Sequence, residues 1–530
     1  MKTSKTTMAG AAPESADADF SLARLIRDQA SSRGDAAALI FNDEITSYRE
    51  VDQRSNQLAN ALAARGVGAG DRIAILARNS PVFYEAVFAC SKLGAVLVAL
   101  NWRLSTRELN VIIPDSDSRV HLVDDEFVDK LDGLDVGSIS LQREYEAMLK
   151  EQPATDPGLV PGAAPIDHET TVLQLYSSGT TGLPKGILIT NGNLSKTAES
   201  AQKLYLMDES STNLVIPPLF HIGGIGYGMN AVASGGRTLI APAADAETLV
   251  ELISEWNVTH SFMVPAMVQL LVDSPLFTPD KARTLECIAF GGAPMSEALY
   301  RRAAAALSCR FTAVYGMTET AGTVVGDVPN PLATEEDRLR SIGTCGRPLP
   351  WMGEIAVFDP ETSERCMPGV TGEIWVRSQQ VTPGYWKRPD ATAESIRPDG
   401  WFRTGDAACA DERGNLYLKD RLKDMIITGG ENVFPAEVES VIDELDDVAE
   451  VAVIGVASQK WGETVKAVIV RKPDSALTEE AVIAYARENL AHYKCPTSVD
   501  FMGELPRNGA GKVLKPVIRS WYDDNGDGAR

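Results

Sequence analysis

A segment rich in hydroxyls and glycines follows a predicted apolar strand. Residues Tyr176–Gly186 read Tyr-Ser-Ser-Gly-Thr-Thr-Gly-Leu-Pro-Lys-Gly. Glycine lets a backbone approach a polyphosphate closely, hydroxyls offer donors, and a lysine supplies positive charge. The Walker phosphate loop is excluded, because Lys185 follows a proline and precedes a glycine. The segment predicts a phosphate-binding loop of another kind, formed by Ser177, Ser178, Gly179, Thr180, Thr181, Gly182 and Lys185.

Further segments with charged, aromatic or glycine residues follow this loop. They are Pro218-Leu-Phe-His-Ile-Gly223, Tyr315-Gly-Met-Thr-Glu-Thr320, Trp401-Phe-Arg-Thr-Gly-Asp406, Tyr417-Leu-Lys-Asp-Arg-Leu-Lys-Asp424 with Gly429-Gly-Glu-Asn-Val-Phe-Pro435, and Pro506-Arg-Asn-Gly-Ala-Gly-Lys512. Each segment alone is a weak to moderate signal. In this order, and from end to end, the chain resembles the adenylate-forming superfamily of acyl-CoA synthetases, peptide-synthetase adenylation domains and firefly-type luciferases.

The resemblance implies an enzyme that uses ATP to convert a carboxylic acid into an acyl-adenylate and passes the acyl group to a thiol. Cations and N–H donors must then neutralise the charge that collects on the phosphates. Glu319 is expected to hold Mg²⁺, Thr318 to donate to the α-phosphate, and Tyr315 to stack on adenine. The other residues expected at the nucleotide are Gly291, Gly292, Ala293 and Gly316.

Charged groups nearer the C-terminus receive their roles from the same resemblance. Asp406 is expected to accept hydrogen bonds from both ribose hydroxyls, because an ionised carboxylate offers only acceptors. Arg421 is expected to reach the same ribose or the phosphate. Lys423 stands at the family's hinge position, and Gly429 with Gly430 is expected to line the passage for the pantetheine arm of CoA.

Lys512 is the residue that the resemblance places between the substrate carboxylate and the phosphate oxygen under attack. A lysine that serves only adenylation must leave for the second half-reaction, so we expect the C-terminal domain to rotate. In the same way His221 is expected to shape the carboxylate end of the acyl site and to act as a gate. Losing one electrostatic contact of the Lys512 kind typically costs on the order of 10²–10³ in rate.

The acid that such an enzyme would activate is predicted only by class. The segments expected around the acyl group are apolar and rich in glycine, and no acidic or amide group stands ready for an amino-acid ammonium. We therefore expect a hydrophobic monocarboxylic acid, whether aliphatic, aryl or polycyclic. The glycines expected to leave space for it are Gly223, Gly224, Gly226, Gly228, Gly291 and Gly292, with Ala293 beside them.

The pattern of apolar segments predicts the elements that position these groups. Short strands such as Cys287–Phe290 alternate with helical lengths such as Tyr48–Arg65, which predicts buried sheets covered by helices. After about Trp351 the chain becomes β-rich, as in Gly372–Arg377. We expect an α/β fold with a disordered tail at 1–19, an adenylate-forming domain at 20–420 that includes a small β-rich part, and an α+β lid at 421–530 with its hinge near 423.

Composition limits the remaining classes. A net charge of −23, spread along 530 residues with 44% hydrophobic and 23% charged, argues against nucleic-acid binding. The seven cysteines form no C-x-x-C pair, which fits a reducing cytoplasm and argues against zinc. No leader and no run long enough to span a membrane is predicted. A homodimer is compatible with all of this.

Several alternatives stay open at this level. CoA is the simplest acceptor, and ATP, Mg²⁺, CoA and a carboxylic acid are the expected partners. A separate carrier protein is the main enzymatic alternative. Luciferase-like oxidation is disfavoured because Ile427 stands where the luciferases carry a lysine. A catalytically silent nucleotide-binding protein is also disfavoured, because Lys185, Glu319, Asp406 and Lys512 are all present.

Overall fold

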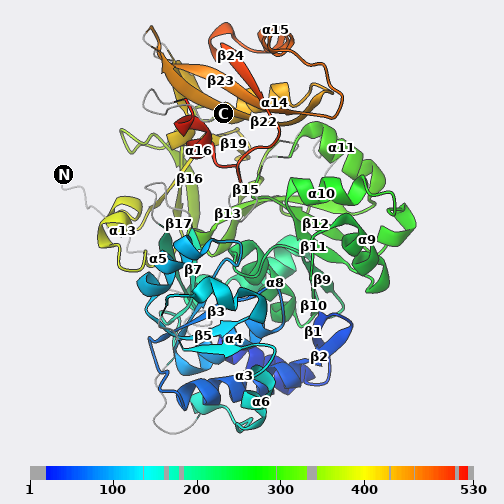
Figure 1. Cartoon of the computed structure of the whole chain (residues 1–530), viewed down its shortest axis with the longest axis vertical. Coiled ribbons are helices and arrows are strands. Elements are labelled where there is room, and N and C mark those ends of the chain that lie inside the picture. The colour runs from blue at the N-terminus through cyan, green and yellow to red at the C-terminus, as the bar shows by residue number, and fades with distance from the viewer. Residues whose placement is uncertain are drawn as a thin grey trace, which may run out of the picture.

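Four β-sheets with helices packed around them form the protein (Figure 1). The computed structural model describes residues 20–134, 137–159, 166–177, 184–293, 295–330, 343–428, 431–458, 460–507 and 513–522. The predicted α/β fold is confirmed, with two large sheets in the N-terminal part, a small sheet after them, and an α+β unit at the C-terminal end. The tail predicted at 1–19 lies outside the described residues.

The two large sheets have six and nine strands, and most neighbouring strands in them are parallel. Their strand orders are β6-β5-β3-β4-β7-β8 and β15-β14-β13-β12-β11-β9-β10-β1-β2. Parallel neighbours need crossover connections, and helices supply most of them. The strands are β1 (Ala37–Phe41), β2 (Glu44–Ser47), β3 (Arg72–Leu76), β4 (Val96–Ala99), β5 (Ser118–Val123), β6 (Ser138–Ser140), β7 (Thr171–Ser177), β8 (Lys185–Thr190), β9 (Thr212–Val215), β10 (Arg237–Ile240), β11 (His260–Met263), β12 (Cys287–Phe290), β13 (Arg310–Met317), β14 (Gly322–Gly326) and β15 (Arg347–Pro348).

Helices cover both faces of the nine-stranded sheet. Helices α9, α10 and α11 share one apolar core with its strands, and α8 packs on the opposite face, where it also meets the core of the six-stranded sheet. Burial on both faces explains why the strands read as apolar runs. The helices of this part are α2 (Leu22–Arg33), α3 (Tyr48–Ala63), α4 (Val82–Leu93), α5 (Thr106–Ser116), α6 (Tyr145–Lys150), α7 (Thr197–Ser200), α8 (Ile222–Ser234), α9 (Ala246–Glu255), α10 (Pro265–Val272) and α11 (Glu297–Ala306).

The other two sheets follow in the chain. The antiparallel order β16-β17-β18-β19 makes the small sheet, and β21-β20-β23-β22, with β24 beside β23, makes the C-terminal one. Their elements are β16 (Glu354–Phe358), β17 (Gly372–Arg377), α13 (Pro389–Ser395), β18 (Phe402–Ala410), β19 (Leu416–Arg421), β20 (Ile426–Thr428), β21 (Glu431–Val433), α14 (Pro435–Ile442), β22 (Val448–Ser458), β23 (Gly462–Arg471), α15 (Glu479–Asn489), β24 (Ser498–Met502) and α16 (Lys515–Ser520).

The connection from β19 to the C-terminal unit is held by charged contacts. Asp420 accepts a hydrogen bond from the backbone N–H of Ala436 at 2.9 Å, and the Lys515 ammonium lies 3.6 Å from the Asp420 carboxylate. Further along, Asp424 accepts from the guanidinium of Arg519 at 3.0 Å. Residues on both sides of the predicted hinge are therefore tied to α14 and α16.

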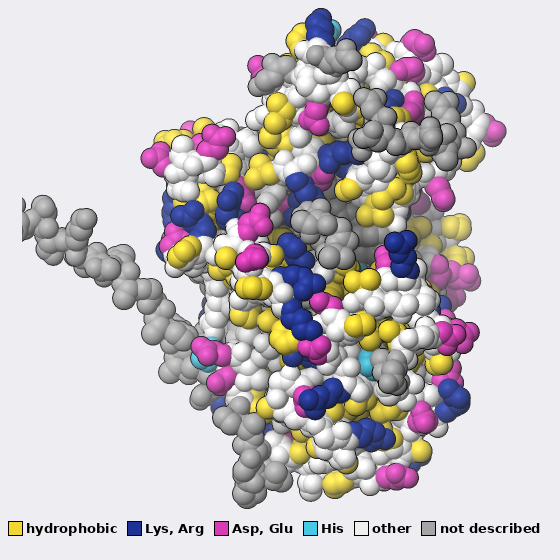
Figure 2. Space-filling model, turned by 60° about the vertical axis from the view of Figure 1, so that its left-hand side comes forward, with side chains coloured by type: hydrophobic (Ala, Val, Ile, Leu, Met, Phe, Trp, Pro, Cys, Tyr) yellow, Lys and Arg dark blue, Asp and Glu magenta, His cyan; other side chains and the backbone are white. Residues whose placement is uncertain are grey.

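The surface carries charges of both signs. Figure 2 shows Lys and Arg side chains gathered along the middle of one face, with Asp and Glu side chains close to them. An acidic chain therefore still presents local positive groups to an anion. No helix in the described ranges is long and apolar enough to cross a bilayer.

Candidate active site

A buried carboxylate brings three predicted site residues together. Asp406 lies on β18 with 7% of its surface exposed, and Arg421 is its register partner on β19. The Arg421 guanidinium lies 2.7 Å from one carboxylate oxygen, and the Tyr315 hydroxyl donates to the other at 2.7 Å. Tyr315 comes from β13 of the nine-stranded sheet, so this cluster joins two sheets. An ionised acceptor held in this way is suited to bind a vicinal diol.

Glu319 is a second buried carboxylate nearby. It lies in the 3₁₀ turn Thr318–Thr320 that follows β13, and it is 9% exposed. Burial raises the pKa of Glu319. The Tyr385 hydroxyl donates to its Oε1 at 3.2 Å. A buried carboxylate of this kind is stabilised by a cation, as expected for a metal ligand.

The residues present fit Mg²⁺ as a partly hydrated, phosphate-bridging ion. The described part of the chain contains no cluster of three or more His, Cys, Asp or Glu side chains that would make an all-protein metal cage. Mg²⁺ in phosphate-transfer sites takes one or two carboxylates and completes its shell with water and phosphate oxygens. Glu319 alone satisfies that requirement.

A segment that the sequence analysis missed couples Glu319 to the phosphate loop. Residues 382–388 run between the two: the Thr382 N–H donates to the backbone carbonyl of Glu319 at 2.7 Å, and the Trp386 N–H donates to the carbonyl of Gly186 on β8 at 2.7 Å. Tyr385, within the segment, contacts the Glu319 side chain. Glu319, the predicted metal ligand, and β8, the strand that follows the predicted phosphate loop, therefore share one support.

Asp115, at the end of α5, anchors that segment from the other side. Its carboxylate accepts from the Tyr176 hydroxyl and from the guanidinium of Arg388, both at 2.8 Å. Its backbone carbonyl accepts from the Trp386 indole at 3.0 Å. Tyr176 lies on β7, the strand that precedes the predicted phosphate loop. Asp115 therefore links β7 to the 382–388 segment. No pattern in the sequence singles it out, since its partners are far apart in the chain.

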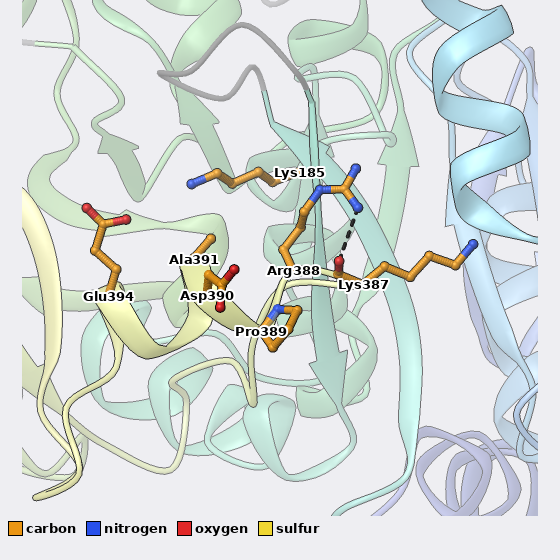
Figure 3. Close-up of a pocket in the computed structure, with 7 residues that line it drawn as sticks. All are labelled: Lys185, Lys387, Arg388, Pro389, Asp390, Ala391 and Glu394. Carbon is orange, nitrogen blue, oxygen red and sulfur yellow. Dashed lines mark hydrogen bonds between the residues drawn. The ribbon is translucent and has the colours of Figure 1, made fainter.

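Lys185, at the start of β8, lines a cavity together with residues of 387–394. The cavity has a volume of about 310 Å³, and the Lys185 ammonium lies 5.0 Å from the centre of the Tyr385 ring. Figure 3 shows Lys185 extending toward the side of α13 that bears Glu394, while the Lys387 ammonium points the other way. The charge of Lys185 is thus available beside the predicted polyphosphate position. The cavity is lined by Lys185, Lys387, Arg388, Pro389, Asp390, Ala391 and Glu394.

His221 occupies the N-terminal boundary of α8, where its backbone is extended. Burial, and after it the charge of Arg103, lowers the pKa of His221 to about 4. Its ring packs 4.5 Å from that of Phe220, and Nε2 has no hydrogen-bond partner among the described residues. The imidazole is therefore neutral at physiological pH and suited to packing and hydrogen bonding.

The expectation that the glycines of α8 open a cavity is wrong for two of them. A Cβ on Gly224 would lie 2.2 Å from the Pro218 carbonyl, and one on Gly228 would lie 1.8 Å from the Tyr84 hydroxyl. These glycines let the helix pack closely against its own protein. The same holds for Gly291, whose Cβ would lie 2.4 Å from a backbone carbonyl. Gly223 faces the Phe262 ring at 3.3 Å.

The structure describes some of the remaining predicted residues, and the others lie outside the described part. Gly292 and Ala293 are exposed where β12 ends, and Gly316 packs against the backbone of β14. Lys423 lies in the turn after β19 with its side chain exposed, and desolvation by its neighbours lowers its pKa. Outside the described residues lie Ser178, Gly179, Thr180, Thr181, Gly182, Gly429, Gly430 and Lys512.

Comparison with known proteins agrees with this arrangement. The model of AMP-binding enzymes matches residues 26–386, and that of the AMP-binding enzyme C-terminal domain matches residues 437–512. The chain belongs to the AMP-binding enzyme family. The predicted membership of the adenylate-forming superfamily is thereby confirmed, and so is the prediction of an enzyme.

Individual relatives of this AMP-binding enzyme match over nearly their whole length. Fatty acid–[acyl-carrier-protein] ligase ScoC of Streptomyces coeruleorubidus is 34% identical, over 93% of this chain and 94% of its own. Feruloyl-CoA synthase of an Amycolatopsis species is 36% identical, over 91% and 95%. The structure of o-succinylbenzoate CoA synthetase from Bacillus subtilis with ATP and a magnesium ion is 31% identical, with a TM-score of 0.82 over 94% and 99%.

The anchoring role of Asp115 can be tested by substitution. We expect Asp115→Ala to raise the KM for MgATP on the order of tenfold, because the Tyr176 hydroxyl and the Arg388 guanidinium each lose a partly buried hydrogen-bond acceptor. The KM for the acid should change little. Asp117→Asn is the matched control, since Asp117 forms an exposed pair with Lys387 at 2.7 Å and such pairs contribute little. Equal effects of the two variants on the KM for MgATP would contradict this role.

The lowered pKa of His221 predicts how kcat/KM depends on pH. A group with a pKa of about 4 is neutral throughout pH 5.5–8, so it contributes no ionisation to kcat/KM in that range. His221→Gln should lower the height of the profile and leave its shape unchanged. A titration near pH 6.5 that is present in the unmodified enzyme and absent from the variant would show that His221 exchanges a proton during turnover.

Proposed function

We propose that this enzyme adenylates a hydrophobic monocarboxylic acid with ATP and transfers the acyl group to CoA, releasing AMP and pyrophosphate. The observation that carries the proposal is the Tyr315–Asp406–Arg421 cluster, a buried acceptor for a ribose diol at the junction of two sheets. Membership of the AMP-binding enzyme family supports a nucleotide as the ligand of this cluster. ATP, Mg²⁺ and CoA are the cofactors and co-substrates that follow.

Charge neutralisation explains how the described residues promote adenylation. The substrate carboxylate and the triphosphate repel each other, and fixed cations lower that barrier. Lys185 lies beside the phosphate loop, and Arg421 lies beside the ribose acceptor Asp406. Bound Mg²⁺ supplies Lewis-acid stabilisation of the phosphate oxygens. Tyr385 holds the Glu319 carboxylate in place for it.

The second half-reaction calls for a different arrangement of the C-terminal unit. We assign Lys512 to the carboxylate in the first half-reaction, Lys423 to the hinge, and Gly429 with Gly430 to the pantetheine passage. Thiolate attack on the acyl carbon forms the thioester bond and expels AMP, which carries away the electron pair of the broken C–O bond. The domains proposed at 20–420 and 421–530 would rotate about this junction between the two steps.

The acceptor is CoA in this proposal, and a carrier protein is the second candidate. Feruloyl-CoA synthase and o-succinylbenzoate CoA synthetase support CoA by their names. One relative, ScoC, is named as a fatty acid–[acyl-carrier-protein] ligase, which favours the alternative. We further propose that the protein acts in the cytoplasm, in accord with its seven cysteines, all of them free.

The acyl site is proposed to lie along α8, between the His221 end and the aromatic residues beneath it. The Phe262 ring lies against Gly223, and its centre is 5.5 Å from that of the Tyr227 ring. These side chains are apolar and buried or partly buried, as a hydrophobic acid requires. The aromatic surface supports an aryl or polycyclic acid as well as an aliphatic one.

The products of turnover test the reaction class. With ATP, Mg²⁺, CoA and a panel of aliphatic, aryl and polycyclic acids, we expect AMP, pyrophosphate and an acyl-CoA in equal amounts. Formation of ADP would indicate a kinase or an ATPase instead. Formation of AMP and pyrophosphate without a thioester, followed by acylation of an added carrier protein, would assign the second acceptor. Absence of all products across the panel would contradict an active ligase.

A lysine variant separates the two half-reactions. Lys512→Ala should lower the adenylation rate on the order of 10²–10³, because one electrostatic contact to the transition state is lost. With synthetic acyl-adenylate supplied, its thioester formation should approach that of the unmodified enzyme. Lys472→Ala, at an exposed position on the same domain, is the matched control. Equal loss of both half-reactions in Lys512→Ala would contradict the rotating lid.

A further inference from the structure

Helix α8 carries a buried tyrosine hydroxyl that no described residue hydrogen-bonds. Tyr227 is 6% exposed, and its Oη has no hydrogen-bond partner among the described residues. Its neighbour Tyr205 packs edge to face at a ring distance of 5.2 Å, but the Tyr205 hydroxyl is bonded to Thr323 at 3.1 Å. Burial raises the pKa of Tyr227 well above its ordinary value, so the group stays a neutral hydroxyl.

Tyr227 is connected to the nucleotide site through one buried cluster. Ala289, Val314 and Tyr315 belong to the same group of contacting residues as Tyr227, and the Tyr315 hydroxyl holds Asp406. Helix α8, which carries Tyr227, begins next to His221 and runs into the interior between the two large sheets (Figure 1). An acyl chain that passes His221 and follows α8 inward therefore meets Phe262 first and Tyr227 next.

The sheet beneath this path changes from apolar to polar with depth. Phe262 and Ala289 are register partners on β11 and β12, and Phe262 faces α8. Two residues earlier on the same strands, and hence on the same face, stand the partners His260 and Cys287. Both are buried. The deep end of the proposed acyl site is thus lined by polar groups, with the Tyr227 hydroxyl above them.

We propose that Tyr227 determines specificity by hydrogen-bonding an oxygen-bearing group at the far end of the acid. This inference rests on the proposed function. A buried hydroxyl without a partner is costly, and native proteins rarely tolerate one unless something outside the chain satisfies it. The preferred substrates are hydrophobic acids that carry a hydroxyl or oxo group remote from the carboxylate. Unsubstituted hydrocarbon acids leave the Tyr227 hydroxyl unpaired and are poorer substrates.

Matched pairs of acids test this specificity. Each pair differs only in a distal oxygen: 4-hydroxycinnamate and cinnamate, 10-hydroxydecanoate and decanoate, and a polycyclic acid with and without a ring oxo group. In at least one pair we expect kcat/KM for the oxygenated acid to exceed that of its partner about tenfold, the equivalent of about 1.4 kcal/mol. Tyr227→Phe should abolish this preference by lowering kcat/KM for the oxygenated acid alone.

Tyr205→Phe is the matched control, because it removes a neighbouring buried hydroxyl that already has a partner. It should leave the preference in place, and thermal unfolding of both variants reports whether the fold is kept. A Tyr227→Phe protein that does not fold is replaced by Tyr227→Trp, which keeps an aromatic ring and moves the donor. No preference in any pair, or a preference that survives loss of the hydroxyl, overturns the inference and means that water satisfies Tyr227.

The outcome also separates this inference from the function on which it rests. If no acid in the panel yields AMP, the proposed ligase activity itself fails. If unsubstituted acids are converted to acyl-CoA as fast as their oxygenated partners, the ligase activity stands and only the role of Tyr227 is wrong.

Discussion

The pairing of Asp406 with Arg421 and Tyr315 is the interaction on which the rest of the active site depends. A carboxylate that is almost fully buried would be destabilised by desolvation without donors on both of its oxygens. The donors come from β13 and β19, so the charge can be kept only if the nine-stranded sheet and the small sheet are held at a fixed distance. The same constraint places the start of the C-terminal unit beside the proposed ribose acceptor Asp406.

The residues next to the predicted phosphate loop are likewise held in place by contacts between distant segments. The 382–388 segment forms backbone hydrogen bonds with the Glu319 turn and with β8, and Asp115 holds it against the first strand of the phosphate loop. The Glu319 carboxylate, whose pKa is raised, and strand β8 belong to distant segments, and neither would be positioned precisely without a shared support. Backbone hydrogen bonds from residues 382–388 to both segments hold them at a fixed separation.

The sequence predicted much of this arrangement, and its failures have physical causes. The strands Cys287–Phe290 and Gly372–Arg377 have the predicted bounds, because apolar runs between turn residues leave little freedom. Asp406 and Arg421, both predicted to lie at the ribose, form an ion pair that the sequence analysis did not predict. Tyr385 and Asp115 were missed because their roles arise only from tertiary contacts. The prediction that the α8 glycines open a cavity failed for Gly224 and Gly228. The sequence shows that a glycine lacks a side chain, but it does not show which neighbouring residue fills that space.

Two consecutive residues at the end of β19 bind different parts of the protein. Asp420 is bound to α14 and α16, whereas Arg421 is bound to β18. Adjacent side chains of a strand point to opposite faces, so this division depends on the parity of the strand. Insertion or deletion of a single residue in β19 would turn the Asp420 carboxylate toward β18 and the Arg421 guanidinium toward α16. The turn before β19 can therefore change in length during evolution only if Asp420 and Arg421 keep pointing to the faces that they now occupy.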